Sequence, residues 1–285
     1  MAESTLEIHL DGLPFSEVKN VIETEVFIET GNSETMKQIQ ILLEEGPSNY
    51  SMSILRPTVS NTLQSCSNEK MSILFYQPFS NLVDLSLKSQ EGPISIGTLS
   101  STLFTTANAI TETGSISVDY VICTQSFISK TNEGSFTIGT IRGSSVSLET
   151  GEGTIDINYI SSPKVLISSN KGSIQALRIE LQNITDSCDL DVKTMEGGIT
   201  IPLLEAPNIG SCTLSIYSRL GNIDLVLKDF SGLFTVSAKQ GEIDIPGSQQ
   251  CDRANECSGS VNTNSMSESQ LSVVADEGNV RIIFV

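Results

Sequence analysis

Two pairs of acidic residues stand at matching places beside glycines that recur along the sequence. Asp224 and Asp244 each follow such a glycine by three residues, and Glu133 and Glu152 each come directly before one. If neighbouring repeats stack, the members of a pair lie about 5 Å apart, a separation that suits a retaining glycosidase or a calcium site. Because no histidine, lysine or aromatic cluster accompanies either pair, we interpret them as solvated surface carboxylates.

Histidine and glycine motifs offer little further chemistry. His9 is the only histidine, and no Ser-His-Asp or Cys-His arrangement can be proposed around it. The sequence contains neither a phosphate-binding nor a dinucleotide-binding glycine motif. We therefore predict no catalytic, cofactor-binding or metal-binding residues and no enzyme activity.

The six cysteines are too sparse for a disulfide framework. Cys188 and Cys212 each precede a repeat glycine by nine residues, so they should stack on the inward side of adjacent coils. We expect buried free thiols there, with a disulfide or a metal pair as alternatives. Cys251 and Cys257 could form a small disulfide, but we favour thiols because no secretory signal is recognised.

These residues are positioned by a repeat of about twenty residues. Apolar residues stand seven and five positions before each glycine and two and four positions after it, and only Ser129 breaks this pattern. The alternation predicts two short strands joined at a tight corner. A small residue always stands three positions before the glycine, whose own backbone is expected to adopt a positive φ. The repeat glycines are Gly92, Gly114, Gly134, Gly153, Gly172, Gly197, Gly221, Gly241 and Gly278.

One coil cannot bury its apolar face alone, whereas stacked coils can. The predicted fold is therefore all-β, a right-handed parallel β-solenoid (β-helix) of about nine two-strand coils, with a β-sandwich as the rival. Residues 1–80 are predicted to form a β-rich N-terminal cap or imperfect coils, and a short helix could begin after Ser16. Residues 81–285 form the repeat domain, with a polar loop inserted at residues 246–270.

The repeat resembles a known family. Residues 110–118 (ITETGSISV) and 148–157 (LETGEGTIDI) are similar to repeats of the adhesin β-solenoid family, which is widespread in bacteria and has eukaryotic members. The resemblance extends over about residues 80 to 285. It implies a β-solenoid, offers no catalytic motif, and in bacteria implies surface attachment.

The charge and the hydropathy exclude several classes of partner. The 34 acidic residues outnumber the 16 basic ones, so the chain carries a net charge of −18 and repels nucleic acid and anionic membranes. No apolar run is long enough to span a membrane. With neither a secretory signal nor a transit peptide recognised, we expect an intracellular, cytoplasmic protein.

We interpret the chain as a non-catalytic binding or scaffolding protein that presents an acidic, repetitive surface to a protein partner. One alternative is a subunit docked in a larger assembly through its solenoid end. A second alternative is a carbohydrate-active enzyme that uses the paired surface carboxylates. Because the sequence stops at Val285, in the second strand of the last repeat, we expect the strand edge there to require a cover: the 246–270 loop, the N-terminal 80 residues or another molecule. Such an edge could support a homodimer through the C-terminal coil.

Overall fold

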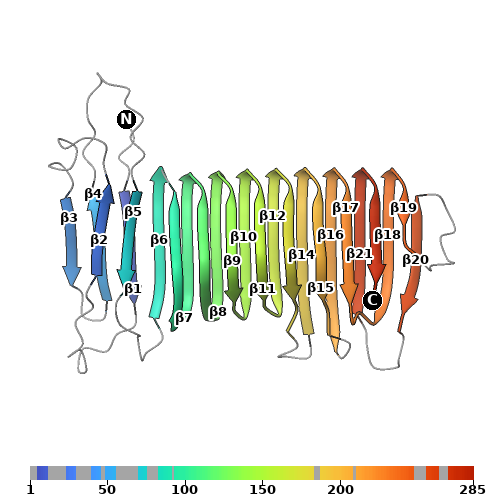
Figure 1. The fold of residues 1–285 in the computed structure, drawn as a ribbon, viewed down its shortest axis with the longest axis horizontal. Helices are drawn as coiled ribbons and strands as arrows, with labels where there is room; N and C mark the ends of the chain where they lie inside the picture. The colour runs from blue at the N-terminus through green and yellow to red at the C-terminus, as the bar shows by residue number, and fades with distance from the viewer. Residues whose placement is uncertain are drawn as a thin grey trace, which may run out of the picture.

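The predicted all-β parallel solenoid is confirmed (Figure 1). The computed structural model describes residues 5–11, 24–29, 40–45, 49–55, 70–75, 83–91, 93–182, 187–207, 210–246, 255–262 and 269–285. Every regular element in these ranges is a β-strand. The described residues contain no helix with the length and apolarity that crossing a membrane requires. The segment 16–22, where a short helix could begin, lies outside the described ranges.

The strands follow one another in the order β1 (Thr5–Asp11), β2 (Thr24–Glu29), β3 (Gln40–Glu45), β4 (Asn49–Leu55), β5 (Lys70–Phe75), β6 (Val83–Glu91), β7 (Ile94–Thr113), β8 (Ile116–Glu133), β9 (Phe136–Arg142), β10 (Ser145–Glu152), β11 (Ile155–Ser161), β12 (Lys164–Lys171), β13 (Ile174–Glu180), β14 (Ser187–Glu196), β15 (Ile199–Glu205), β16 (Ser211–Leu220), β17 (Ile223–Lys228), β18 (Gly232–Gln240), β19 (Ile243–Asp244), β20 (Glu256–Val261), β21 (Ser269–Glu277) and β22 (Val280–Phe284).

A coil consists of two strands joined at a corner glycine, by which the coil is named. Six coils have two separate strands: β10 and β11, β12 and β13, β14 and β15, β16 and β17, β18 and β19, and β21 and β22. The earlier repeats differ because the long strands β7 and β8 each join the second strand of one repeat to the first strand of the next. The number of separate coils is therefore slightly lower than the nine that were predicted.

Neighbouring coils pair in parallel and in register, so equivalent side chains stack. Val146 lies beside Val165, and Ile155 lies beside Ile174. Period-2 alternation then separates the two faces of each strand: Ile155 is completely buried, whereas its neighbour Thr154 is exposed. All described apolar positions of this kind contribute to one continuous core. Ser129, the exception in the pattern, is also buried.

The corner explains both the glycine and the small residue before it. Gly153 has a φ of 148°, and a Cβ there would lie 2.1 Å from the carbonyl oxygen of Gly134 in the preceding coil. The predicted positive φ is confirmed at Gly153 and six other repeat glycines but not at Gly241, and the close approach of two backbones excludes a side chain as well. The hydroxyl of Thr150 donates a hydrogen bond to the same Gly134 oxygen at 2.8 Å. The small residue is therefore also a hydrogen-bond donor that joins two corners.

An antiparallel strand covers the first coil. Strand β1 pairs antiparallel with β6, the first strand of the solenoid, and on its other side with β4. Strand β3 continues this sheet beyond β4, while β2 and β5 form a separate antiparallel pair. Within the described residues, these N-terminal strands are antiparallel and do not repeat the parallel coil. The boundary near residue 80 and the right-handed winding of the coils stay predictions.

The last coils are not stacked in the order of the sequence. Strand β21 lies between β16 and β18 and pairs in parallel with both (Figure 1). On the opposite side, β22 lies between β17 and β19. The Gly278 coil, last in the sequence, is thus inserted between the Gly221 and Gly241 coils. Strand β20 then pairs antiparallel with β18 on the outer side of the Gly241 coil.

This order corrects two predictions. The C-terminal coil has a neighbouring coil on each side, so it is not the end of the stack and the reason for a homodimer through it is removed. Residues 256–261, predicted as part of the polar loop 246–270, form strand β20 instead. Residues 247–254 and 263–268 of that segment lie outside the described ranges. The sequence pattern missed both features because it defines each coil but not the spatial order of the coils.

Candidate functional site

The structure separates the first predicted pair of carboxylates. Asp224 and Asp244 belong to coils that are consecutive in sequence, but Arg281 of the inserted coil lies in register between them. The guanidinium of Arg281 forms an ion pair with Asp244, with Nε 3.5 Å from Oδ2. The expected stacking of the two aspartates is wrong, and an arginine between them cannot serve as the partner acid of a glycosidase.

The second pair is adjacent, but it does not form an isolated acid pair. Glu133 and Glu152 lie in register on β8 and β10. Glu152 forms a close ion pair with Lys171 of the next coil, and both side chains are more than half exposed. The hydrogen bond to Glu152 raises the pKa of Lys171. These residues are therefore solvated surface charges, and among the described residues no group of three His, Cys, Asp or Glu side chains could hold a metal ion.

The prediction of free thiols at Cys188 and Cys212 is wrong, because these residues form a disulfide. They lie in register on β14 and β16, with Cα atoms 4.5 Å apart, and both are buried. Cys257 is also disulfide-bonded, whereas Cys251 lies outside the described residues. Cys123 is a buried free thiol, and burial raises its pKa to about 12, so it is not a nucleophile at neutral pH.

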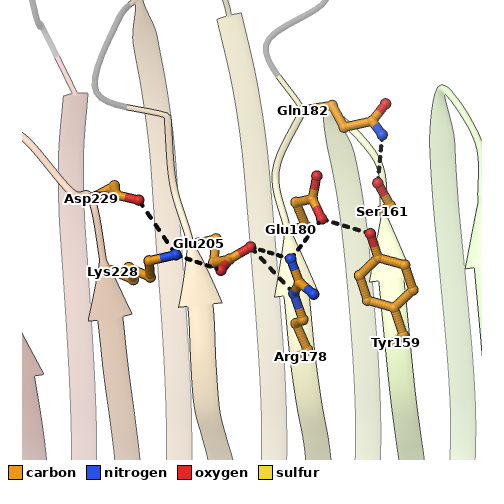
Figure 2. Close-up of polar contacts among 8 residues, drawn as sticks. All are labelled: Tyr159, Ser161, Arg178, Glu180, Gln182, Glu205, Lys228 and Asp229. Carbon is orange, nitrogen blue, oxygen red and sulfur yellow. Dashed lines mark hydrogen bonds and ion pairs between the residues drawn. The ribbon is translucent and has the colours of Figure 1, made fainter. Parts of the chain in front are cut away.

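A connected polar network occupies the ends of the second strands (Figure 2). Its side chains stack across β11, β13, β15 and β17 because these strands pair in parallel and in register. The sequence analysis did not predict this network, although the spacing of its residues from the corner glycines could have indicated it. Tyr159 and Arg178 each follow a corner glycine by six residues, and Glu180 and Glu205 each follow one by eight. The network consists of Tyr159, Ser161, Arg178, Glu180, Gln182, Glu205, Lys228 and Asp229.

Arg178 is the centre of the network. Its guanidinium donates hydrogen bonds from Nη2 to Glu205 at 2.6 Å and to Glu180 at 3.1 Å, and from Nε to Glu205 at 3.2 Å. The same group lies over the ring of Tyr159, 5.1 Å from its centroid. The Tyr159 hydroxyl donates to Glu180 at 2.6 Å, and Lys228 binds the second oxygen of Glu205 at 3.1 Å. Each central group therefore contacts residues of neighbouring coils.

The network holds its members in their usual protonation states. Arg178, followed by Lys228, lowers the pKa of Glu205, and the bond to Glu205 raises the pKa of Arg178. Hydrogen bonding to Glu205 likewise raises the pKa of Lys228. Burial and the bond to Glu180 raise the pKa of Tyr159. All four groups titrate further from neutrality than usual, which is the opposite of what a general acid or base requires.

Beside the network, outward apolar side chains form a row across four coils. Leu177 on β13 is 59 % exposed, which is unusual for a large apolar side chain on this solenoid. The row continues through Pro202 and Leu203 on β15 and Val226 on β17 to Ile283 on β22, which lies in register with Val226. Strand β15 has a β-bulge between Ile201 and Leu204, so its two residues Pro202 and Leu203 lie opposite the single residue Val226 of β17. This apolar row is defined as Leu177, Pro202, Leu203, Val226 and Ile283.

A second polar cluster joins the inserted coil to both of its neighbours. Asp276 accepts a hydrogen bond from the Tyr217 hydroxyl of the Gly221 coil at 2.7 Å. Its other oxygen lies 2.7 Å from Nζ of Lys239 in the Gly241 coil. The bonds to Lys239 and Tyr217 lower the pKa of Asp276. This cluster joins three coils and contributes to their order.

Comparison with known proteins supports the fold. Neither the curated proteins nor the solved structures gave a match. The family model named Toastrack DUF4097 matches residues 20–283, which is most of the sequence and includes the N-terminal strands β2 to β5 as well as the solenoid. The family description carries no activity. The chain belongs to the Toastrack DUF4097 family.

Proposed function

We propose that this chain is a non-catalytic binding or scaffolding protein whose lateral surface contacts a protein partner. The observation that carries the proposal is the network around Arg178, which is the most connected polar cluster of the described residues. Its charged groups are paired with one another, and the pKa values of Arg178 and Glu205 are shifted away from neutrality. A surface of this kind presents fixed charges and hydrogen-bonding groups, but it does not supply a proton donor or acceptor near pH 7.

One strand at each end of the solenoid has an antiparallel partner, which favours binding through the sides. Strand β1 pairs with the first coil, and strand β20 pairs with the Gly241 coil at the other end. Both additions are antiparallel, so neither end continues the parallel stacking. Docking through the C-terminal coil therefore has little support, whereas the long outer faces are exposed. The resemblance to adhesin solenoids is consistent with binding without chemistry, and attachment to a cell surface is not part of this proposal.

The cellular compartment is also a proposal, and the disulfide provides its test. Disulfides persist in oxidising compartments and are rare in the cytosol. The cytoplasmic location expected from the sequence therefore requires the thiols of Cys188 and Cys212 to be reduced in cells. Thiol labelling of the full chain, after rapid acid quenching of intact cells and denaturation, distinguishes the two cases. Labelling of both cysteines supports the cytoplasm, and protection of both overturns that location.

The binding function is tested by affinity capture of the full chain from its native cells, followed by reconstitution with the purified partner. We expect a stoichiometric complex in which neither component is chemically changed. The matched control is a chain with Arg178→Glu, which reverses the central charge of the network at a half-buried surface position. A complex with a defined partner supports the proposal. Turnover of a small molecule or glycan by the purified chain overturns it.

A further inference from the structure

Resting on the proposed binding function, we infer that the apolar row is the docking surface for a basic amphipathic helix of a partner protein. The row comprises Leu177, Pro202, Leu203, Val226 and Ile283, on strands β13, β15, β17 and β22. Outward positions elsewhere on these coils are mostly polar, as at Gln175, Thr200 and Asp224. Apolar side chains in consecutive coils form a continuous patch, and a contiguous exposed patch on a soluble protein marks an interaction site.

The dimensions of the row favour a helix over an extended strand. The row crosses four neighbouring strands, so three strand spacings of about 4.8 Å give it a length of roughly 14 Å. A helix rises about 1.5 Å per residue, so nine or ten helical residues cover this length. One face of such a helix provides apolar side chains at each turn, about 5.4 Å apart, close to the spacing of the coils. An added strand parallel to the coils would contact only one or two members of the row.

The charges along both borders of the row specify a basic partner. On one side, Arg178 and Lys228 are outnumbered by Glu180, Glu205 and Asp229, and both cations are already bound to carboxylates. On the other side, Asp224 lies in register with the cation Arg281, and Asp156 and Asp244 lie one strand beyond the two ends of the row. Each border therefore has more carboxylates than cations, and lysine or arginine side chains flanking the apolar face of a helix would meet this excess negative charge. Complementary charges of this kind increase the rate and specificity of association.

The same charges argue against a second copy of this chain as the occupant. The net charge of −18 makes two copies repel one another, and the borders of the row would place carboxylates opposite carboxylates.

The aromatic and arginine side chains next to the row suit an interface with another protein. Tyr159 is held between Arg142 and Arg178, with 5.7 and 5.1 Å from the guanidinium carbons to the ring centroid. Tyrosine and arginine are enriched among the residues that dominate binding energy.

The probe for the test is a synthetic helical peptide of about 14 residues, made of leucine and lysine with the leucines on one face. Its affinity for the full chain is measured by fluorescence anisotropy. We expect Leu177→Glu to weaken binding by about tenfold or more, because it replaces an exposed apolar side chain at one end of the row with a charge. The matched control is Leu166→Glu on β12 of the same coil, which adds the same charge at another exposed leucine. It should change the affinity by less than about twofold.

Two comparison peptides separate the features of the proposal. A peptide of the same composition with alternating leucine and lysine tests the helix, and a peptide with glutamate in place of lysine tests the charge. Weaker binding of both supports the proposal. Equal losses for Leu177→Glu and Leu166→Glu, equal binding of the alternating peptide, or absence of binding to the helical peptide overturns it. If the purified native partner still binds Leu177→Glu with full affinity, the docking surface is wrong while the binding function stands.

Discussion

Gly278 packs against the carbonyl oxygen of Gly221, which a Cβ on Gly278 would approach to 2.3 Å. It does not pack there against Gly241, although Gly241 lies between the two in the sequence. Gly241 in turn packs on Gly278, whose carbonyl oxygen a Cβ on Gly241 would approach to 2.1 Å. The asparagines after two of these glycines repeat the same order. The side chain of Asn222 accepts from the amide of Asn279, and the side chain of Asn279 accepts from the amide of Glu242, each at 2.9 Å. The packing of the corner glycines and the asparagine hydrogen bonds both place the Gly278 coil between the Gly221 and Gly241 coils.

The inserted coil predicts a long-range effect of a C-terminal substitution. Val280→Asp places a charge at a fully buried position of the Gly278 coil. Because β21 pairs with β16 only when the final coil is inserted, we expect amides of residues 211–220 to lose protection in hydrogen exchange, although they lie far earlier in the sequence. Arg281→Gln, at the exposed neighbouring position, is the control and should leave β16 protected. If β16 stays protected in Val280→Asp, the inserted order is wrong.

The register within a coil predicts opposite outcomes for two adjacent residues. Ile155→Asp buries a carboxylate without a partner, and we expect it to cost several kcal/mol, a large part of the stability of a typical domain. Thr154→Asp adds the same carboxylate at an exposed position, and we expect a change of about 0.5 kcal/mol or less. Denaturant unfolding of both variants measures the difference. Equal destabilisation of the two would contradict the assigned faces of β11.

The corner geometry predicts that glycine is required at some positions and replaceable at others. Gly153→Val combines a φ of 148° with a carbonyl oxygen 2.1 Å from the new Cβ, so the corner must shift. We expect a loss of about 2 kcal/mol or more, from both backbone strain and the displaced neighbouring coil. Gly97→Val is the control, because no atom lies within 4 Å of its added Cβ. Thermal unfolding should show a large shift only for Gly153→Val, and similar shifts would remove the reason given for the corner glycine.

Local sequence rules predicted the coil well because each coil follows from a short range of residues. Alternation identified the buried faces around Gly153, and the corner glycine identified the turn. The role of Thr150 was only partly predicted, since a small residue was expected but its hydrogen bond to the preceding corner was not. That bond joins two coils, and a pattern within one coil cannot predict it.

The spatial order of the last coils could not be predicted from the same rules. Every coil has the same apolar faces, so the Gly278 coil fits on the Gly221 coil as well as the Gly241 coil would. Asp224 and Asp244 were therefore expected to stack, and the intervening Arg281 was missed. The segment containing β20 looked like a polar loop because an antiparallel edge strand with small polar residues has little apolar alternation.

The disulfide between adjacent coils predicts a moderate loss of stability on its removal. Cys188 and Cys212 are 24 residues apart in sequence and already lie on paired strands. Replacing both with alanine removes a constraint on the unfolded chain, and we expect a loss of about 2–4 kcal/mol in urea unfolding. Adding a reductant that opens the disulfide should give a similar loss in the native chain and no further loss in the double variant. An unchanged midpoint in both experiments would contradict a disulfide in the native protein.

The last prediction concerns acid stability and the carboxylate that joins three coils. Lys239 and Tyr217 lower the pKa of Asp276 below its ordinary value of 3.8, so the folded state favours the charged carboxylate. A lowered pKa gives a contribution that is fully present above the ordinary value and is lost as the pH falls through the folded value. We therefore expect Asp276→Asn to lower the Tm most at neutral pH, with the difference from wild type shrinking from about pH 4 downward. The exposed Asp244→Asn is the matched control and should show a smaller difference throughout, since its side chain is 65 % exposed. If the difference for Asp276→Asn is the same at pH 7 and at about pH 2, the carboxylate charge does not stabilise the inserted coil.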